Sequence, residues 1–267
     1  MAVARGKTRE LVDWFRDKDS VLVAYSGGVD SAVIAKAALS ALGDRAVAAT
    51  ARSATMPAWE LEAAERTARE IGITHIVFRE DEFETPGFAD NSPDRCYHCR
   101  KGLVKGLREI AARHGIECIV DGANADDTKE HRPGMRAMRE MGVRSPLLEL
   151  GLTKEDVREI ARDFGLSVSE KPSMACLASR VPYGEKITRD KLRRIEKAED
   201  YLRGLGFLEL RVRHHNGIAR IEVAEKDIPM VVERRREITR RLKELGFTYV
   251  SLDLQGYRSG SMDEALR

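Results

Sequence analysis

The chain has 267 residues, 42% hydrophobic and 34% charged, a composition typical of one large or two modest globular domains. It contains no apolar run near the ~20 residues of a membrane span and no signal-peptide core, so we expect a cytoplasmic protein without a membrane partner. A formal net charge of +2 and an aromatic content of 6% argue against a nucleic-acid partner.

Before Pro172 the chain alternates predicted helices and strands. Amphipathic or capped segments predict helices over about 7–18, 31–42, 58–71, 99–114 and 154–164. Short apolar runs predict strands over 21–25, 46–50, 76–78 and 117–120. This alternation is typical of βαβ units, so we expect an α/β fold with a parallel sheet and helices on both faces.

After Pro172 the pattern changes to a small α+β arrangement. We expect a charged helix over about 189–205, strands over 208–213 and 218–223, a helix over 229–245 and a strand over 248–254. Asn216-Gly217 between the first two of these strands is a strong hairpin signal. The sequence therefore predicts a first domain over 1–181 and a second, smaller domain over 182–267.

A glycine-rich turn joins the first strand to the second helix and reads Ser26-Gly27-Gly28-Val29-Asp30-Ser31. Its glycines permit close backbone approach, and amides at the positive end of the helix dipole can hold phosphate oxygens. The serine hydroxyls add donors, and Asp30 is placed to orient the loop or to help hold Mg²⁺. The lysine of a Walker A loop is absent, which favours cleavage of ATP between its α- and β-phosphates.

The alternative for this segment is an ordinary Gly-Gly turn with a capping serine, but the strand before it and the helix after it favour a phosphate loop. With these residues the sequence resembles the PP-loop ATP pyrophosphatases. The resemblance implies an adenine nucleotide alpha-hydrolase-like fold. It also implies adenylation of a carboxylate or carbonyl oxygen with release of pyrophosphate, after which a nucleophile displaces AMP.

Two further loops are expected to face the nucleotide, because ligands of open α/β sheets gather at the carboxyl ends of the strands. Gly122, Asp126 and Asp127 follow the strand over 117–120, and the two carboxylates are candidate magnesium or substrate contacts. A solvated acidic turn is the alternative for them. Arg52, after the second strand, is expected from its position alone to contact the adenosine.

Four cysteines in a chain of this length and composition are read as core residues, metal or cluster ligands, or reactive thiols. Cys96 and Cys99 form a CxxC pair just before a predicted helix. Such a pair suits half a zinc site, a redox pair or part of an iron–sulfur site. Cys118 lies in an apolar strand and is read as a core residue.

Cys176 lies in a segment without clear periodicity at the expected domain junction, where catalytic loops often lie. Together with Cys96 and Cys99 it could hold a [4Fe–4S] cluster by three irons, leaving the fourth open to hydrosulfide. Alternatively Cys176, near Lys171 and Arg180 in the sequence, is a thiolate that attacks an acyl-adenylate. A third possibility is an inert Cys176 beside an unrelated CxxC pair.

Seven segments resemble one family within this superfamily, the LarE sulfur transferases, and the match covers nearly the whole chain. The segments are Arg95-Cys96-Tyr97-His98-Cys99, Asp121-Gly122-Ala123-Asn124, Arg132-Pro133-Gly134, Val143-Arg144-Ser145-Pro146-Leu147, Pro172–Arg180, Arg211-Val212-Arg213-His214-His215 and Leu254-Gln255-Gly256-Tyr257-Arg258.

The resemblance implies an ATP-dependent thiolation. The carboxylates of pyridinium-3,5-biscarboxylic acid mononucleotide are adenylated and become thiocarboxylates, for the nickel-pincer cofactor of lactate racemase. In one branch of the family the cysteine matching Cys176 donates its own sulfur and becomes dehydroalanine. Members with the extra CxxC use a cluster, and this sequence has that pair.

Besides Cys176 and Asp30, the candidate catalytic residues are Ser179 and Arg180, which adjoin the nucleophile. Glu199 is a further candidate by family analogy, although its charged helix is also typical of a solvated face. We expect a homo-oligomer.

Arg211 and Arg213 stand two residues apart on a predicted strand, so both side chains project from one face. Two guanidinium groups on one face would clamp a substrate phosphate. The alternative is a pair of solvated strand arginines. His214 and His215 are expected to shape the hairpin.

Two other functions remain open from the sequence. A tRNA thiolase of the same superfamily would also use CxxC and a third cysteine, but the charge and aromatic content disfavour it. A non-catalytic nucleotide-binding regulator could share the layered fold.

Overall fold

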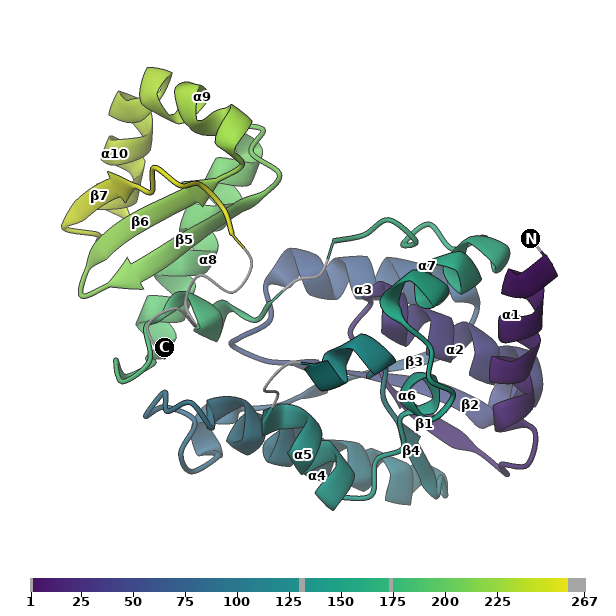
Figure 1. Cartoon of the computed structure of the whole chain (residues 1–267). Helices are drawn as coiled ribbons and strands as arrows, with labels where there is room; N and C mark the ends of the chain where they lie inside the picture. The colour runs from purple at the N-terminus through teal and green to yellow at the C-terminus, as the bar shows by residue number, and fades with distance from the viewer. Residues whose placement is uncertain (1, 130–132, 173–174, 259–267) are drawn as a thin grey trace. The chain divides into compact units, whose positions relative to one another are not determined.

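The computed structural model describes residues 2–129, 133–172 and 175–258 (Figure 1). It divides into two compact units, one of Met1–Pro86 with Cys96–Met174 and the other of Gly87–Arg95 with Ala175–Arg267. The division thus lies earlier than the expected boundary at 182, and the second unit also takes in 87–95. The buried Asn91 explains this, because its side-chain amide donates to the carbonyl oxygens of Val181, Pro182 and Glu185.

The first unit contains a parallel four-stranded sheet in the order β3-β2-β1-β4. Its strands are β1 (Val21–Ala24), β2 (Ala46–Arg52), β3 (Thr74–Arg79) and β4 (Cys118–Val120). The predicted α/β fold with a parallel sheet is confirmed.

Helices cover both faces of this sheet (Figure 1). They are α1 (Ala2–Phe15), α2 (Val29–Leu42), α3 (Ala58–Ile71), α4 (Arg95–His114), α5 (Pro133–Glu140), α6 (Pro146–Glu149) and α7 (Lys154–Asp163). Val21 and Val23 pack into a core shared with α1, α2, α3 and α7, whereas Leu22 packs into a core with α4 and α5. Alternate residues of β1 are thus buried on opposite faces, as its continuous apolar run predicts.

The helix predictions for the first unit need correction. The first helix begins at Ala2, before the expected position 7, and α4 begins at Arg95, before the expected Cys99. Consequently the CxxC pair lies on the first turn of α4, instead of preceding it. The short helices α5 and α6 were not predicted.

The second unit holds a three-stranded sheet in the order β5-β6-β7, antiparallel between β5 and β6 and parallel between β6 and β7. Its elements are α8 (Arg189–Gly204), β5 (Leu210–His215), β6 (Ile218–Val223), α9 (Ile228–Glu233), α10 (Arg235–Glu244) and β7 (Tyr249–Leu252). The predicted α+β unit is confirmed.

The hairpin turn at Asn216-Gly217 is also confirmed, because both residues have the positive φ angles (47° and 87°) that a type I′ turn requires. The single helix expected over 229–245 is wrong. Arg234, at φ −89° and ψ 10°, separates α9 from α10 and donates to the Leu205 carbonyl.

Short 3₁₀ turns complete the structure: Gly43–Arg45, Glu82–Glu84, Ala125–Lys129, Leu177–Arg180 and Glu225–Asp227. Among the helices of the described residues, none has both the length and the apolar character needed to cross a bilayer.

Candidate functional site

The glycine-rich turn leads from β1 into α2, as the sequence predicts. Gly27 has φ +71°, and a Cβ built on it would lie 2.5 Å from the Cα of Ala64 on α3. This close approach admits no side chain, because the obstacle is backbone. Gly27 therefore sets the path of the loop against α3.

Serine hydroxyls brace the loop from within. The Ser26 N–H donates to Oγ of Ser31 at 3.2 Å, and that hydroxyl donates to the Gly28 carbonyl at 3.1 Å. Val29, Asp30 and Ser31 begin α2, so their N–H groups have no acceptor inside the helix. These amides, at the positive end of the dipole, can take phosphate oxygens.

Asp30 is held by two partners that the sequence did not reveal. Its Oδ1 accepts from the Asn124 side-chain amide at 3.1 Å, and its Oδ2 pairs with the ammonium of Lys154 at the start of α7. Gly122 lets these segments meet, since a Cβ on it would lie 3.0 Å from both the Asp30 Cβ and the Ser31 nitrogen. This geometry favours the loop-orienting role for Asp30.

Asp126 and Asp127 lie in the loop after β4, where backbone amides already bind them. Asp126 accepts from the N–H of Lys154 at 2.8 Å, and Asp127 accepts from the N–H of Asn124 at 3.0 Å. Within residues 2–129, 133–172 and 175–258, no three His, Cys, Asp or Glu side chains are grouped so that they could hold a metal ion. Magnesium binding by these carboxylates stays a prediction, as does adenosine binding by Arg52, which is exposed at the end of β2.

Lys171, expected near the Cys176 thiolate, is engaged elsewhere. Its ammonium lies 2.8 Å from the buried carboxylate of Glu60 and 3.2 Å from the Gly27 carbonyl oxygen. The two paired residues are 111 positions apart, so no sequence spacing could have revealed the contact.

The four thiols have different settings. Cys96 and Cys99 lie one turn apart on α4, on one side of the helix, and are half-buried. Cys118 is half-buried against the core, and burial raises the pKa of its thiol. Cys176 is exposed. The first unit thus offers two neighbouring thiols to a cluster. A three-cysteine cluster needs Cys176 from the second unit, and it stays a prediction.

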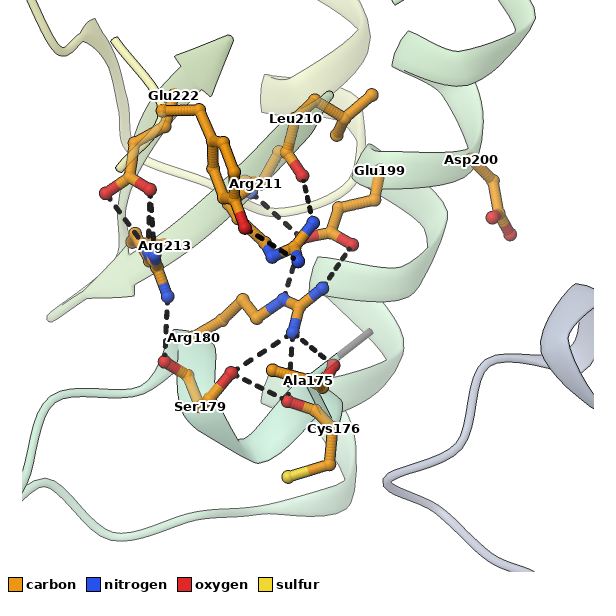
Figure 2. Close-up of polar contacts among 12 residues, drawn as sticks. Ala175, Cys176, Ser179, Arg180, Glu199, Asp200, Leu210, Arg211, Arg213 and Glu222 are labelled. Atoms are coloured by element: carbon orange, nitrogen blue, oxygen red, sulfur yellow. Dashed lines mark hydrogen bonds and ion pairs between the residues drawn. The ribbon is translucent and has the colours of Figure 1, made fainter. Parts of the chain in front are cut away.

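The loop that carries Cys176 is shaped by Arg180, whose side chain is fully buried. Its Nη1 donates to the carbonyl oxygens of Ala175 at 2.6 Å and Cys176 at 3.0 Å, as Figure 2 shows. Its Nε and Nη2 bind the two carboxylate oxygens of Glu199 at 2.9 and 3.0 Å. Arg180 therefore positions the loop, while the Cys176 sulfur points away from these contacts.

Ser179 belongs to the same loop. Its hydroxyl donates to the Cys176 carbonyl at 2.8 Å, and its own carbonyl accepts from Arg213 at 3.0 Å. Its contacts support a positioning role, and direct participation of Ser179 and Arg180 in catalysis stays a prediction.

Glu199 is fully buried, contrary to the solvated setting that its charged helix suggested. Besides the Arg180 guanidinium it accepts the Val212 N–H at 3.0 Å, so it joins the Cys176 loop to β5. The hydrophobic period of α8 could have indicated this, because Ile195 and Leu202 flank Glu199 on the buried face.

We expect Glu199→Gln to lower the free energy of unfolding by about 3–5 kcal/mol, because it leaves the buried charge of Arg180 without a counter-charge. Urea denaturation followed by circular dichroism measures this change. Asp200→Asn is the matched control, since Asp200 is the next residue and its side chain is exposed. An equal loss of stability in Glu199→Gln and Asp200→Asn would contradict a stabilising role of the buried Arg180–Glu199 ion pair.

Arg211 and Arg213 lie on one face of β5, as predicted, but neither is solvated. Arg213 binds the buried carboxylate of Glu222 through Nε at 3.0 Å and Nη2 at 2.8 Å. Glu222 therefore engages Nε and Nη2 of Arg213, and the clamp of Arg211 and Arg213 on a substrate phosphate stays a prediction.

Arg211 donates to the Leu210 carbonyl at 2.7 Å (Figure 2). Its Nη2 lies 3.4 Å from the Tyr257 hydroxyl. Among the residues that the structure describes, no carboxylate forms an ion pair with it. Burial lowers the pKa of its guanidinium, and the positive charge of Arg180 lowers it further. A buried guanidinium without a carboxylate beside it favours binding of an anionic ligand.

No family model matches the chain, but a comparison with individual proteins identifies its family. The chain is 39% identical over 267 residues to the pyridinium-3,5-bisthiocarboxylic acid mononucleotide synthase of Lactiplantibacillus plantarum, covering 100% of this chain and 97% of that protein. The chain belongs to the LarE family.

This LarE-family chain is also 42% identical over 262 residues to an uncharacterised protein of Synechocystis, covering 97% of this chain and 98% of that protein. A tRNA-specific 2-thiouridylase of Zymomonas mobilis is 28% identical over 199 residues, 60% of this chain and 53% of that enzyme. These relatives support the PP-loop superfamily and ATP as the nucleotide.

Sequence reasoning missed several contact partners of the candidate residues. They are Glu60, Lys154 and Glu222, together with Asn124 and Tyr257 beyond their places in family motifs. Arg132, Ser173 and Met174, which belong to family motifs, lie outside the described residues.

Proposed function

We propose that the chain adenylates the carboxylates of pyridinium-3,5-biscarboxylic acid mononucleotide with ATP and converts them to thiocarboxylates. The product would serve the nickel-pincer cofactor of lactate racemase. The observation that carries this proposal is the full-length identity to the synthase of Lactiplantibacillus plantarum. The exposed thiol of Cys176 and the phosphate loop Ser26–Ser31 support it chemically.

In the first step the loop amides hold the phosphates of ATP, and the pair of Asp30 with Lys154 keeps the start of α2 in place. A substrate carboxylate oxygen attacks the α-phosphorus, and pyrophosphate leaves. The resulting acyl-adenylate carries AMP as a good leaving group. Mg²⁺, which we propose accompanies ATP, would neutralise phosphate charge, and Asp126 and Asp127 are the carboxylates that would contact it.

In the second step the Cys176 thiolate attacks the acyl carbon, AMP leaves, and a thioester forms. Removal of the Cys176 Cα proton by a base then breaks the Cβ–Sγ bond. The electron pair of that bond stays on sulfur as the thiocarboxylate, and dehydroalanine remains in the chain. A cluster on Cys96, Cys99 and Cys176 would instead supply sulfide and spare Cys176.

The buried guanidinium of Arg211 would receive the phosphate of the mononucleotide, with the Arg213–Glu222 pair as its support. We further propose that the enzyme acts in the cytoplasm as a homo-oligomer.

The test measures pyrophosphate release from ATP with and without the dicarboxylate mononucleotide. We expect release that requires the substrate, together with a product whose mass shows exchange of oxygen for sulfur. A pyridinium mononucleotide that lacks carboxylates is the matched control and should release none. Release that requires tRNA, with binding that falls steeply with salt, would instead identify a tRNA thiolase. Absence of release with any carboxylate would indicate a non-catalytic regulator.

A further inference from the structure

The segment 253–258 follows β7, and its backbone is hydrogen-bonded to β6. The Asp253 N–H donates to the Ile221 carbonyl at 2.9 Å, and the Tyr257 N–H donates to the Val223 carbonyl at 2.7 Å. Between these two contacts the chain makes a turn, with the Gly256 N–H donating to the Asp253 carbonyl at 3.2 Å. Tyr257 thus has a defined place beside the sheet.

Gly256 makes this path possible. Its φ is +70°, and a Cβ built on it would lie 2.8 Å from the Val223 carbonyl oxygen, which is the acceptor of the Tyr257 N–H. A side chain here would strain the turn and push it away from β6. The glycine therefore permits the backbone contact that places Tyr257.

Tyr257 contacts Arg211, a buried arginine with which no carboxylate of the described residues forms an ion pair. The Arg211 Cζ lies 4.9 Å from the centroid of the Tyr257 ring, and its Nη2 lies 3.4 Å from the Tyr257 hydroxyl. The ring covers one face of the guanidinium, and Leu210 accepts from Nη1 at an edge. The remaining N–H groups of Arg211 are left for a ligand.

We propose that Tyr257 is a positioning residue of the Arg211 anion site and tunes this site for a phosphate monoester. The proposal rests on the function proposed above, in which Arg211 receives the substrate phosphate. The aromatic face holds the guanidinium plane in one orientation, so phosphate binding costs less side-chain entropy. The ring also excludes water from that face, which strengthens the electrostatic attraction between the guanidinium and the phosphate.

Binding of inorganic phosphate to the whole protein, measured by isothermal titration calorimetry at low salt, tests the proposal. Arg211→Met defines the part of binding that belongs to this site, because the amides of the Ser26–Ser31 loop are a second place where phosphate is expected to bind. We expect Tyr257→Leu to weaken that part about tenfold, an effect between those of an exposed and a fully desolvated cation–π contact. Tyr257→Phe keeps the ring and should stay within about threefold of the wild type.

Leu254→Ala is the matched control, because Leu254 lies in the same segment with 83% of its surface exposed. Unchanged phosphate binding in Tyr257→Leu would overturn the proposal, and so would an equal loss in the Leu254 variant. Phosphate binding that Arg211→Met leaves intact would overturn the anion site itself, and with it the role of Tyr257.

A kinetic readout separates positioning from general folding damage. In Tyr257→Leu the KM for the mononucleotide should rise about tenfold, whereas the KM for ATP and kcat should stay within about twofold. Tyr257→Phe should restore the KM. A large fall in kcat, or a rise in the KM for ATP, would contradict a role of Tyr257 that is confined to the phosphate site.

Discussion

Cys176→Ala should abolish thiocarboxylate formation, by roughly three orders of magnitude or more, while substrate-dependent pyrophosphate release continues. The thiol is exposed, and its loop is held by backbone contacts to Arg180 that do not involve the sulfur. Removing the sulfur should therefore leave both the loop and the adenylation step intact. Mass spectrometry of the product, together with a pyrophosphate assay, measures the two steps separately.

Companion variants identify the sulfur source. Cys118→Ala is the control, because the Cys118 thiol packs against the core. This variant should leave sulfur transfer unchanged. If Cys176 is sacrificed, intact mass after turnover should show loss of hydrogen sulfide, and Cys96→Ala should remain active. If a cluster supplies sulfur, anaerobically prepared protein should contain iron, and Cys96→Ala should be inactive. Undiminished transfer by Cys176→Ala would contradict both routes.

Gly27→Ala should lower ATP affinity by about a hundredfold or more. The new Cβ would meet the backbone of Ala64 at 2.5 Å, and φ +71° is unfavourable for alanine, so the loop must leave the position in which its amides converge. Calorimetric titration with ATP measures the affinity, and urea denaturation measures the accompanying loss of stability.

The matched control is Gly72→Ala at the end of α3. Gly72 also has a positive φ (+83°), but a Cβ there would have no heavy atom within 4 Å. We expect this variant to lose about 1 kcal/mol of stability and to bind ATP normally. Normal ATP affinity in Gly27→Ala, or an equal loss of affinity in Gly72→Ala, would contradict the role of the contact between Gly27 and α3.

Much of the fold could be predicted because the signals are local. The apolar run before Ser26 and the capping pattern after it predict a strand, a loop and a helix in that order, and Asn216-Gly217 predicts its turn. Helix ends were less predictable. The first turn of α4 carries polar residues and the CxxC pair, which have no apolar period, so its start at Arg95 was missed.

The sequence by itself determined which chemical groups this protein has: a loop that can bind phosphates, a cysteine in a segment without periodicity, a CxxC pair and two arginines on one strand face. These follow from residue type and short spacing, which local backbone chemistry obeys. Only the tertiary structure decided which charges meet. Asp30 pairs with Lys154 across 124 positions, Arg180 with Glu199, and Arg213 with Glu222, while Arg211 faces Tyr257. Such pairings depend on how sheets and helices pack, because a buried charge is stable only beside a partner brought to it by the fold.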